Sequence, residues 1–132
     1  MYLLDTNVWA TYLRGKNRKV MSRMAAEPID RIVICSIVLA ELYYGVRLSA
    51  KPAKNRIAVE TLVAPYTCLP FAEAAADRFS ALRVHLRSLG TPIGPYDMQI
   101  AAIALASGCT VVTHNTSEFG RVPGLPVEDW ET

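Results

Sequence analysis

The sequence predicts an α/β fold in which helices cover both faces of a central parallel sheet of four to five strands. Short apolar runs suited to strands recur along the chain, helix-forming segments separate most of them, and acids stand where several of these segments meet. This alternation favours a parallel sheet, because two parallel strands need a long crossover connection that is usually a helix.

The first candidate strand starts with the chain and stops abruptly at Asp5. A short continuous apolar run of this kind is typical of a strand buried on both faces. The expected strands are Tyr2–Leu4, Arg31–Cys35, Tyr66–Leu69, Thr110–Thr113 and, at an edge of the sheet, Pro126–Glu128.

The first half of the chain predicts four helices. Thr6 and Asn7 favour the start of the first one, because their side chains can accept from free backbone N–H groups. Ser36 is placed as a similar cap, and Pro52 can open a helix because proline suits a first turn. The expected helices are Val8–Leu13, Arg18–Ala26, a segment from Ile37 to between Gly45 and Leu48, and a segment from Pro52 that ends by Pro65.

The second half predicts a long helix over Ala72–Leu89, which Gly90 ends, and a nearly all-apolar helix over Asp97–Ala106 at the centre of the fold. The loop between them, Thr91–Tyr96, is rich in proline and glycine. The segment His114–Arg121 is expected to be a loop that Phe119 anchors in the core. The apolar face of the long helix consists of Phe79, Leu82, Leu86 and Leu89.

The composition fits a compact protein: 132 residues, 52% of them hydrophobic and 20% charged, suit a single domain over residues 1–132. The longest apolar run, Ile100–Ala106, is far shorter than the ~20 residues of a membrane span. No basic-then-apolar leader precedes the first strand, so a cytoplasmic protein that does not contact membranes is expected.

The three cysteines, Cys35, Cys68 and Cys109, predict buried free thiols. Their number is odd, no two form a C-x-x-C pair, and each lies in or beside an apolar run. This pattern disfavours a disulfide framework or a zinc site.

The net charge of +2 is too small to prove a polyanionic partner, but the basic residues are clustered. Such clusters are either solvated surface or a binding surface for a phosphate backbone, and both interpretations remain open at this stage. One cluster consists of Arg14, Lys16, Arg18 and Lys19, and the other of Arg47, Lys51, Lys54 and Arg56.

Three acids are placed where open α/β sheets bind ligands. Asp5 ends the first strand, Glu41 lies early in the helix after the second strand, and Asp97 opens the central apolar helix. Ligand crevices lie at the carboxyl ends of parallel strands, so these acids are expected to converge there. The alternative is structural: each acid suits the N-terminal end of a helix, as a cap or a partner of the helix dipole.

The segment after the fourth strand offers two further oxygen ligands, Asn115 and Glu118, although Glu118 also suits an exposed surface position. Several carboxylates in one crevice repel one another unless cations or protons neutralise them. Oxygen-only ligation favours Mg²⁺ or Mn²⁺, with Asp5 as the best bridging ligand because strand ends are rigid.

A magnesium or manganese site of this kind supports phosphoryl transfer. One ion makes hydroxide from a bound water, and a second ion about 3.5–4 Å away stabilises the leaving oxygen. His85 and His114 each stand alone, so neither a zinc site nor a nucleophilic triad is expected.

At these residues the chain resembles the PIN-domain nucleases and, within them, the VapC-type toxins of bacterial toxin–antitoxin pairs. The similar segments occur in the same order along almost the whole chain. They are Leu4–Asn7, Ala40–Leu42 with Gly45, Gly94–Asp97, Val112–Phe119, Val122–Leu125 and Glu128–Trp130.

The resemblance implies a parallel α/β/α sandwich and a Mg²⁺-dependent endoribonuclease, with Mn²⁺ as a substitute, that inhibits translation by cutting structured RNA such as tRNA. It also implies a homodimer and a cognate antitoxin whose tail covers the active site. By position, Asp5, Glu41 and Asp97 are the metal-binding acids. Many relatives have Asp where this chain has Asn115, so the remaining ligand is Glu118, or Asn115 through water. Thr6, Asn7 and Thr113 would position waters or ligands.

Two other functions are weighed against the nuclease. An aspartyl-nucleophile phosphatase usually has a second acid two residues after the first, but Asn7 occupies that place, and the chain has no room for a cap domain. A non-catalytic PIN-like module that only binds RNA or a partner protein would have lost the acids, whereas Asp5, Glu41 and Asp97 are all present.

Overall fold

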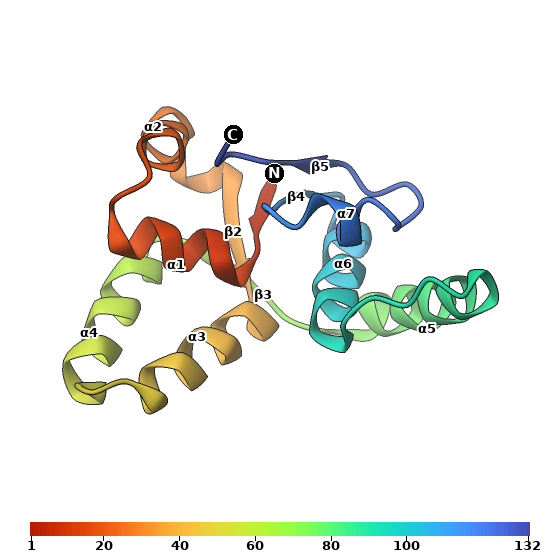
Figure 1. The fold of residues 1–132 in the computed structure, drawn as a ribbon, viewed down its shortest axis with the longest axis horizontal. Coiled ribbons are helices and arrows are strands. Elements are labelled where there is room, and N and C mark those ends of the chain that lie inside the picture. Colours follow the sequence, from red (N-terminus) through yellow and green to blue (C-terminus); the bar gives the residue numbers. More distant parts are fainter.

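A five-stranded parallel sheet runs through the centre of the molecule (Figure 1). The structure is a computed structural model that describes residues 1–132. The spatial order of the strands is β3-β2-β1-β4-β5, and every neighbouring pair is parallel. The predicted α/β fold is therefore confirmed, with all five expected strands present. The strands are β1 (Tyr2–Leu4), β2 (Ile32–Cys35), β3 (Thr67–Leu69), β4 (Thr110–Val112) and β5 (Val127–Glu128).

The helices form two layers, one on each face of the sheet (Figure 1). From β1 through β2 to β3 the chain moves in one direction across the sheet, and from β3 to β4 it crosses back, so right-handed crossovers place the two sets of helices on opposite faces. The first layer contains α1 (Thr6–Arg14), α2 (Arg18–Ala26), α3 (Ser36–Leu48) and α4 (Pro52–Val63). The second contains α5 (Glu73–Leu89), α6 (Pro95–Ser107) and the short α7 (Thr116–Phe119).

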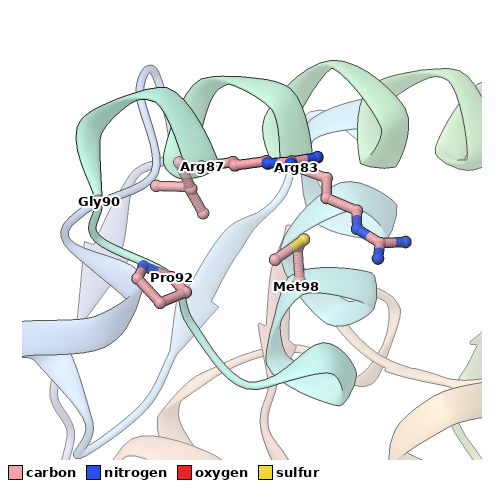
Figure 2. Close-up of a pocket in the computed structure, with 6 residues that line it drawn as sticks. Arg83, Arg87, Gly90, Pro92 and Met98 are labelled. Carbon is pink, nitrogen blue, oxygen red and sulfur yellow. The ribbon is translucent and has the colours of Figure 1, made fainter.

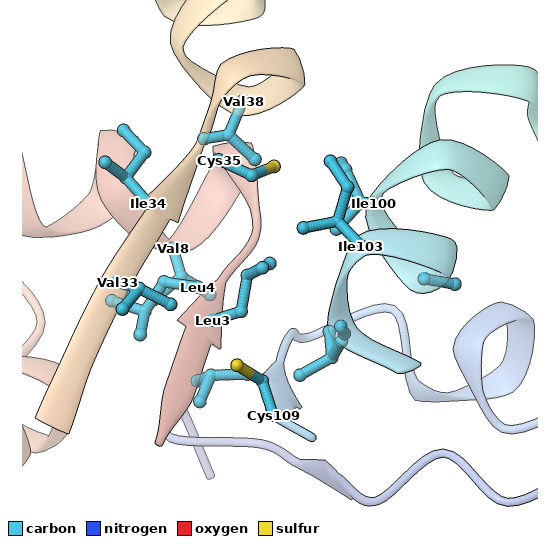
Figure 3. Close-up of a cluster of buried hydrophobic side chains, with 14 of the residues drawn as sticks. Leu3, Leu4, Val8, Val33, Ile34, Cys35, Val38, Ile100, Ile103 and Cys109 are labelled. Carbon is cyan, nitrogen blue, oxygen red and sulfur yellow. The ribbon is translucent and has the colours of Figure 1, made fainter. Parts of the chain in front are cut away.

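One cluster of 29 buried hydrophobic residues joins the sheet to both layers. Figure 3 shows that Leu3 of β1 points towards Ile103 of α6, whereas Leu4 lies on the other side of the strand, near Val8 of α1. The nearly all-apolar α6 is buried on most sides, as predicted for a central helix. No helix has the length and apolar character needed to cross a membrane.

Several element boundaries differ from the sequence-based expectation. Helix α1 begins at Thr6, because Asp5 caps it by accepting from the Val8 N–H. Cys35, rather than Ser36, precedes α3, and the Ser36 hydroxyl instead accepts from the Phe71 N–H. The loop before α6 ends at Gly94, since Pro95 forms the first turn.

The expected loop His114–Arg121 contains α7, so that prediction is wrong for Thr116–Phe119. A single turn of helix is too short to show periodicity in a sequence. Phe119 is fully buried, which confirms its predicted role as an anchor.

Two predictions of burial are also wrong. Cys68 is exposed, whereas Cys35 and Cys109 are buried, and all three thiols are free. Cys68 lies on β3, which is an edge strand and therefore has a neighbouring strand on one side only. Leu89, the last residue of α5, is 59% exposed, whereas Leu82 and Leu86 on the same helix are buried.

Candidate active site at the carboxyl edge of the sheet

Asp5 is the most deeply placed acid of the site, with 6% of its surface exposed. Its Oδ1 accepts from the Val8 N–H at 3.0 Å, and its Oδ2 accepts from the Thr113 hydroxyl at 2.6 Å. Burial raises the pKa of Asp5, the negative charges of Glu131 and Glu41 add to that rise, and the two hydrogen bonds oppose it. A carboxylate has about four lone-pair sites, so each oxygen keeps one for a further ligand.

Thr6, next to Asp5, positions the second predicted acid. The Thr6 hydroxyl donates to Glu41 Oε1 at 2.7 Å, which holds the half-buried Glu41 on α3 beside the start of α1. Thr6, the residue after Asp5, therefore holds Glu41 near Asp5. The negative charges of Asp5 and Glu41 both raise the pKa of Asp97.

Asp97 lies in the first turn of α6 and meets Glu118 of α7. Burial raises the pKa of Asp97 to about 7, and the hydrogen bond and negative charge of Glu118, with the charges of Asp5 and Glu41, add to that rise. Partial burial acts to raise the pKa of Glu118 as well, but hydrogen bonds from Gly94, Asn115 and Asp97 lower it overall. Within this pair, Asp97 is therefore the carboxyl group that favours the protonated form, and Glu118 the one that favours the charged form.

The Glu118 carboxylate is held from two sides. The Gly94 N–H donates to its Oε1, and the Asn115 side-chain amide donates to its Oε2. The interpretation of Glu118 as a plain surface acid is therefore wrong, and Asn115 acts here as a partner of Glu118. A Cβ added at Gly94 would lie 3.5 Å from Glu118 Oε1 and 3.9 Å from Asp97 Oδ2, so both carboxyl groups border this glycine.

The four acids share one electrostatic environment but are not tightly clustered. Only His114, Asp129 and Glu131 offer ligand atoms that all lie within 4.8 Å of one another. Asp97 and Glu118 are in direct contact, but no three of Asp5, Glu41, Asp97 and Glu118 meet this spacing, which suits ions that keep several waters in their coordination shell. The charge, the oxygen chemistry and the free lone pairs of these acids fit Mg²⁺ or Mn²⁺.

His114 does not stand alone, contrary to the sequence-based expectation. Its Nδ1 lies 3.0 Å from Asp129 Oδ2, and the hydrogen bond to Asp129 raises the pKa of this exposed imidazole, with the charges of Asp129 and Glu131 adding to the effect. Sequence reasoning also missed Glu131, whose charge reaches Asp5. Strand β5 pairs with β4 and thereby brings the C-terminal acids to the site, a contact that no local pattern signals.

Two hollows adjoin the Thr6–Glu41 pair. The first, of about 620 Å³, is lined by Thr6, Ile37, Ala40, Glu41, Tyr44 and Tyr96. The second, of about 340 Å³, lies among α1, α3 and α4 and includes Leu13, Gly45, Asn55 and Val59 in its lining. Tyr44 and Tyr96 are 66% and 58% exposed, so a large apolar surface borders the acids.

The two basic clusters lie on the first layer of helices. The residues of the cluster from Arg14 to Lys19 are exposed around the turn between α1 and α2. In the other cluster, Arg56 stacks on Tyr43 at 3.7 Å and pairs with Glu60, while Arg47, Lys51 and Lys54 are exposed. A role of these clusters in RNA binding stays a prediction.

The PIN domain family model matches residues 2–125, nearly the whole chain. The chain belongs to the PIN-domain family. Among curated relatives, it is 37% identical to the tRNA(fMet)-specific endonuclease VapC of Salmonella typhimurium over 129 residues, which cover 98% of this chain and 97% of the relative. It is 33% identical to Ribonuclease VapC2 of Haemophilus influenzae, with the same coverage of both chains. These relatives place the chain among the VapC-type ribonucleases of the PIN-domain family.

Solved structures agree with this assignment. The fold matches the DNA-bound VapBC of Salmonella typhimurium with a TM-score of 0.92 at 37% identity, over 98% of this chain and 97% of that one. It matches VapBC2 of Rickettsia felis, bound to a DNA fragment from its promoter, with a TM-score of 0.91 at 32% identity over 98% of both chains. The parallel α/β/α sandwich that the resemblance implied is confirmed.

Proposed function

We propose that this PIN-domain ribonuclease is the toxin of a toxin–antitoxin pair and cuts tRNA in a reaction that depends on a divalent cation. The observation that carries this proposal is the group of four acids at the carboxyl edge of the sheet, in which the pKa of Asp97 is raised to about 7. A protein that keeps such mutually repelling, half-buried carboxyl groups together gains from them only when a cation or a reaction uses their charge.

Asp5, Glu41, Asp97 and Glu118 are the groups that would hold the cation, with Mg²⁺ as the resident ion and Mn²⁺ as a substitute. When bound, such ions activate water and stabilise negative charge on the phosphodiester. Asn115 supports this arrangement as a donor to Glu118. Whether Asn115 also contacts a cation through water is a separate part of the proposal.

The other residues of the chain orient the acids. Thr113 and the Val8 N–H fix both oxygens of Asp5. The Thr6 hydroxyl fixes Glu41, and Asp97, whose pKa is raised to about 7, is the acid at which a bound cation would compete with a proton. This set of fixed hydrogen bonds is a preorganised arrangement, in which little structural change is needed when charge develops in the reaction.

The proposed partner is an antitoxin whose tail covers the site, because solved relatives are VapBC complexes. The apolar hollows beside Glu41 are the surface such a tail would bury: Tyr44, Tyr96 and Leu48 are exposed there or nearby, at 66%, 58% and 69%. Two copies of the toxin are expected to pair within such an assembly.

The alternatives receive less support. Asn7, at the position where an aspartyl phosphatase needs its second acid, is exposed and has no carboxylate. A module that only binds RNA or a partner protein has no use for the Asp97–Glu118 pair. The tRNA(fMet)-specific relatives at 37% and 36% identity make tRNA(fMet) the first substrate to test.

The test is cleavage of tRNA(fMet) and of a mixed tRNA pool by the purified protein, free of co-expressed partner, in Mg²⁺, in Mn²⁺ and in EDTA. Asp5→Asn is the matched inactive variant, since it keeps the shape of the side chain and removes its charge. Discrete fragments made only by wild type and only with a cation support the proposal. Cleavage that persists in EDTA or in Asp5→Asn would show that the assigned site is wrong.

Glu118→Gln tests whether Glu118 contacts the cation. If Glu118 contacts the cation, the variant loses activity in Mg²⁺ and recovers part of it in excess Mn²⁺. Unchanged activity in Mg²⁺ removes Glu118 from the ligand set.

A further inference from the structure

Two arginines on α5 have no acidic partner. Arg83 and Arg87 are both exposed and lie one helical turn apart, so their positive charges face the same side of the helix. The ion pairs of the structure use Arg23, Arg31, Arg56 and His114, and none uses these two residues. Like charges at this spacing destabilise a helix, so the pair carries an unrecovered cost in the free protein.

Both arginines line a hollow of about 410 Å³ between α5 and α6 (Figure 2). Leu86 and Met98 are the buried members of its lining, Gly90 and Pro92 complete it, and it contains no acid. A second hollow of about 320 Å³ includes Arg83 and Arg87 again, next to Phe79, Ser80 and Val84. The positive surface therefore continues along α5.

This basic pocket adjoins the acidic site through Arg121. The Arg121 Nη1 donates to the Pro92 carbonyl at 3.0 Å, at the rim of the pocket, while the charge of the same guanidinium lowers the pKa of Glu118. Pro92 and Met98 also flank Gly94 and Asp97 along the chain. Pro92 and Arg121 therefore connect the lining of the basic pocket to Glu118 of the acidic site.

We propose that the Arg83–Arg87 pocket binds a backbone phosphate of the RNA substrate, away from the linkage that is cut. The proposal rests on the proposed function. The four acids repel RNA, so affinity for the substrate has to come from cations outside the cleavage site. Guanidinium groups are suited to this because their fork of N–H donors matches two phosphate oxygens.

A structural role at the end of α5 explains only one of the two arginines. Arg87 lies in the last turn and interacts well with the negative end of the helix dipole. Arg83 lies a full turn earlier, where the effect of the dipole has largely decayed. A ligand that contacts both residues explains why Arg83 and Arg87 lie on the same side of α5.

The test measures binding separately from cleavage. The parent is the full chain with Asp5→Asn, and the probe is fluorescein-labelled tRNA(fMet), followed by anisotropy in Mg²⁺ at several KCl concentrations. We expect Arg83→Gln and Arg87→Gln each to weaken binding roughly three- to tenfold. In the double variant, the slope of log affinity against log salt concentration should become less steep by about 1.5. Arg78→Gln is the matched control, since Arg78 lies on α5 but lines a different hollow, and it should change affinity less than twofold.

The same substitutions in the otherwise wild-type chain add a kinetic test. They are expected to raise the KM for tRNA cleavage in proportion to the loss of affinity and to leave kcat within about twofold. Arg83→Lys with Arg87→Lys should restore the salt dependence but only part of the affinity, because lysine is a point charge without the fork. Unfolding midpoints equal to that of the parent exclude a defect in folding.

Each other outcome decides a different point. Unchanged affinity and salt dependence in the double variant overturn the phosphate pocket, even if wild type cleaves tRNA as proposed. Weakened binding without any cleavage by wild type keeps the pocket and overturns the proposed activity. If tRNA binding is unchanged but binding to an antitoxin is lost, the pocket is a protein-docking surface, and this inference is wrong.

Discussion

At the scale of single residues, the carboxyl groups of the site divide into two kinds. Asp5 has both oxygens fixed by donors, from Val8 and Thr113. Asp97 and Glu118 instead have opposite pKa shifts: burial and the neighbouring negative charges raise the pKa of Asp97 to about 7, while hydrogen bonds lower the pKa of Glu118. Asp5 is therefore fixed in place, whereas Asp97 and Glu118 are the acids at which a bound cation would compete with a proton.

Asp97→Asn should abolish cleavage, by at least about 100-fold, and yet stabilise the metal-free protein at pH 8 by about 1 kcal/mol. The raised pKa means that the folded state holds a proton more tightly than the unfolded chain, so Asp97 costs stability as pH rises from about 4 towards 7. Urea unfolding in EDTA at pH 8 and pH 4 measures this. The gain should vanish at pH 4, and Asp30→Asn, at an exposed acid, should show no gain at either pH.

Thr113→Val should lower kcat/KM about tenfold, because it removes the hydroxyl that donates to Asp5 Oδ2 at 2.6 Å. That hydrogen bond lowers the pKa of Asp5, so its loss should move the acidic limb of the pH–rate profile to higher pH. Thr113→Ser keeps the hydroxyl and is the control. An equal loss of rate at every pH would mean that Thr113 does not act through Asp5.

At the scale of elements, the site depends on where strands end and helices begin. Asp5 ends β1 and caps α1, while Glu41 and Asp97 lie early in α3 and α6. These placements followed from the sequence, because strand–helix alternation together with an acid at each junction leaves few arrangements. Helix α7 did not follow, since one turn shows no periodicity, and it is this helix that brings Glu118 to Asp97.

Phe119→Ala should destabilise the fold by about 3–5 kcal/mol, the usual cost of emptying the space of a buried phenylalanine. Phe119 is fully buried and attaches α7 to the core. Thermal or urea unfolding gives the value, and activity at a temperature where the variant is folded shows whether Glu118 has lost its place. Phe119→Leu, which fills more of the space, should cost clearly less. Equal losses for both would point to the ring itself and not to its volume.

At the scale of the whole molecule, the features that could not be predicted from the sequence depend on pairing between strands that are distant in the chain. Cys68 is exposed because β3 is an edge strand, and the order of strands is not written in any local pattern. His114 meets Asp129 because β5 pairs with β4. The fold and the positions of Asp5, Glu41 and Asp97 at junctions of strands and helices were predictable from local patterns, whereas the contact of Glu118 with Asp97, the exposure of the edge strand and the C-terminal acids required the assembled structure.

Cation binding should stabilise the whole fold in a pH-dependent way. Mn²⁺ at a fixed millimolar concentration should raise the unfolding midpoint more at pH 8 than at pH 5.5, because the proton on Asp97 competes with the cation below a pKa of about 7. Thermal unfolding with and without Mn²⁺ at both pH values measures this. Asp97→Asn should show a small effect of Mn²⁺ at both. A larger shift at pH 5.5 in wild type would contradict the assignment of these acids as ligands.

The order of the strands in the sheet affects when the active site can form during synthesis of the chain. Strand β1 is synthesised first, but one of its two neighbours is β4, and the Asp5 N–H donates to the Val112 carbonyl while the Asp5 side chain accepts from Thr113. A nascent chain that has released only its first hundred or so residues therefore has the Val8 N–H that binds Asp5 but lacks Val112 and Thr113. We therefore expect a chain that ends before β4 to lack the fixed orientation of Asp5 and, with it, nuclease activity.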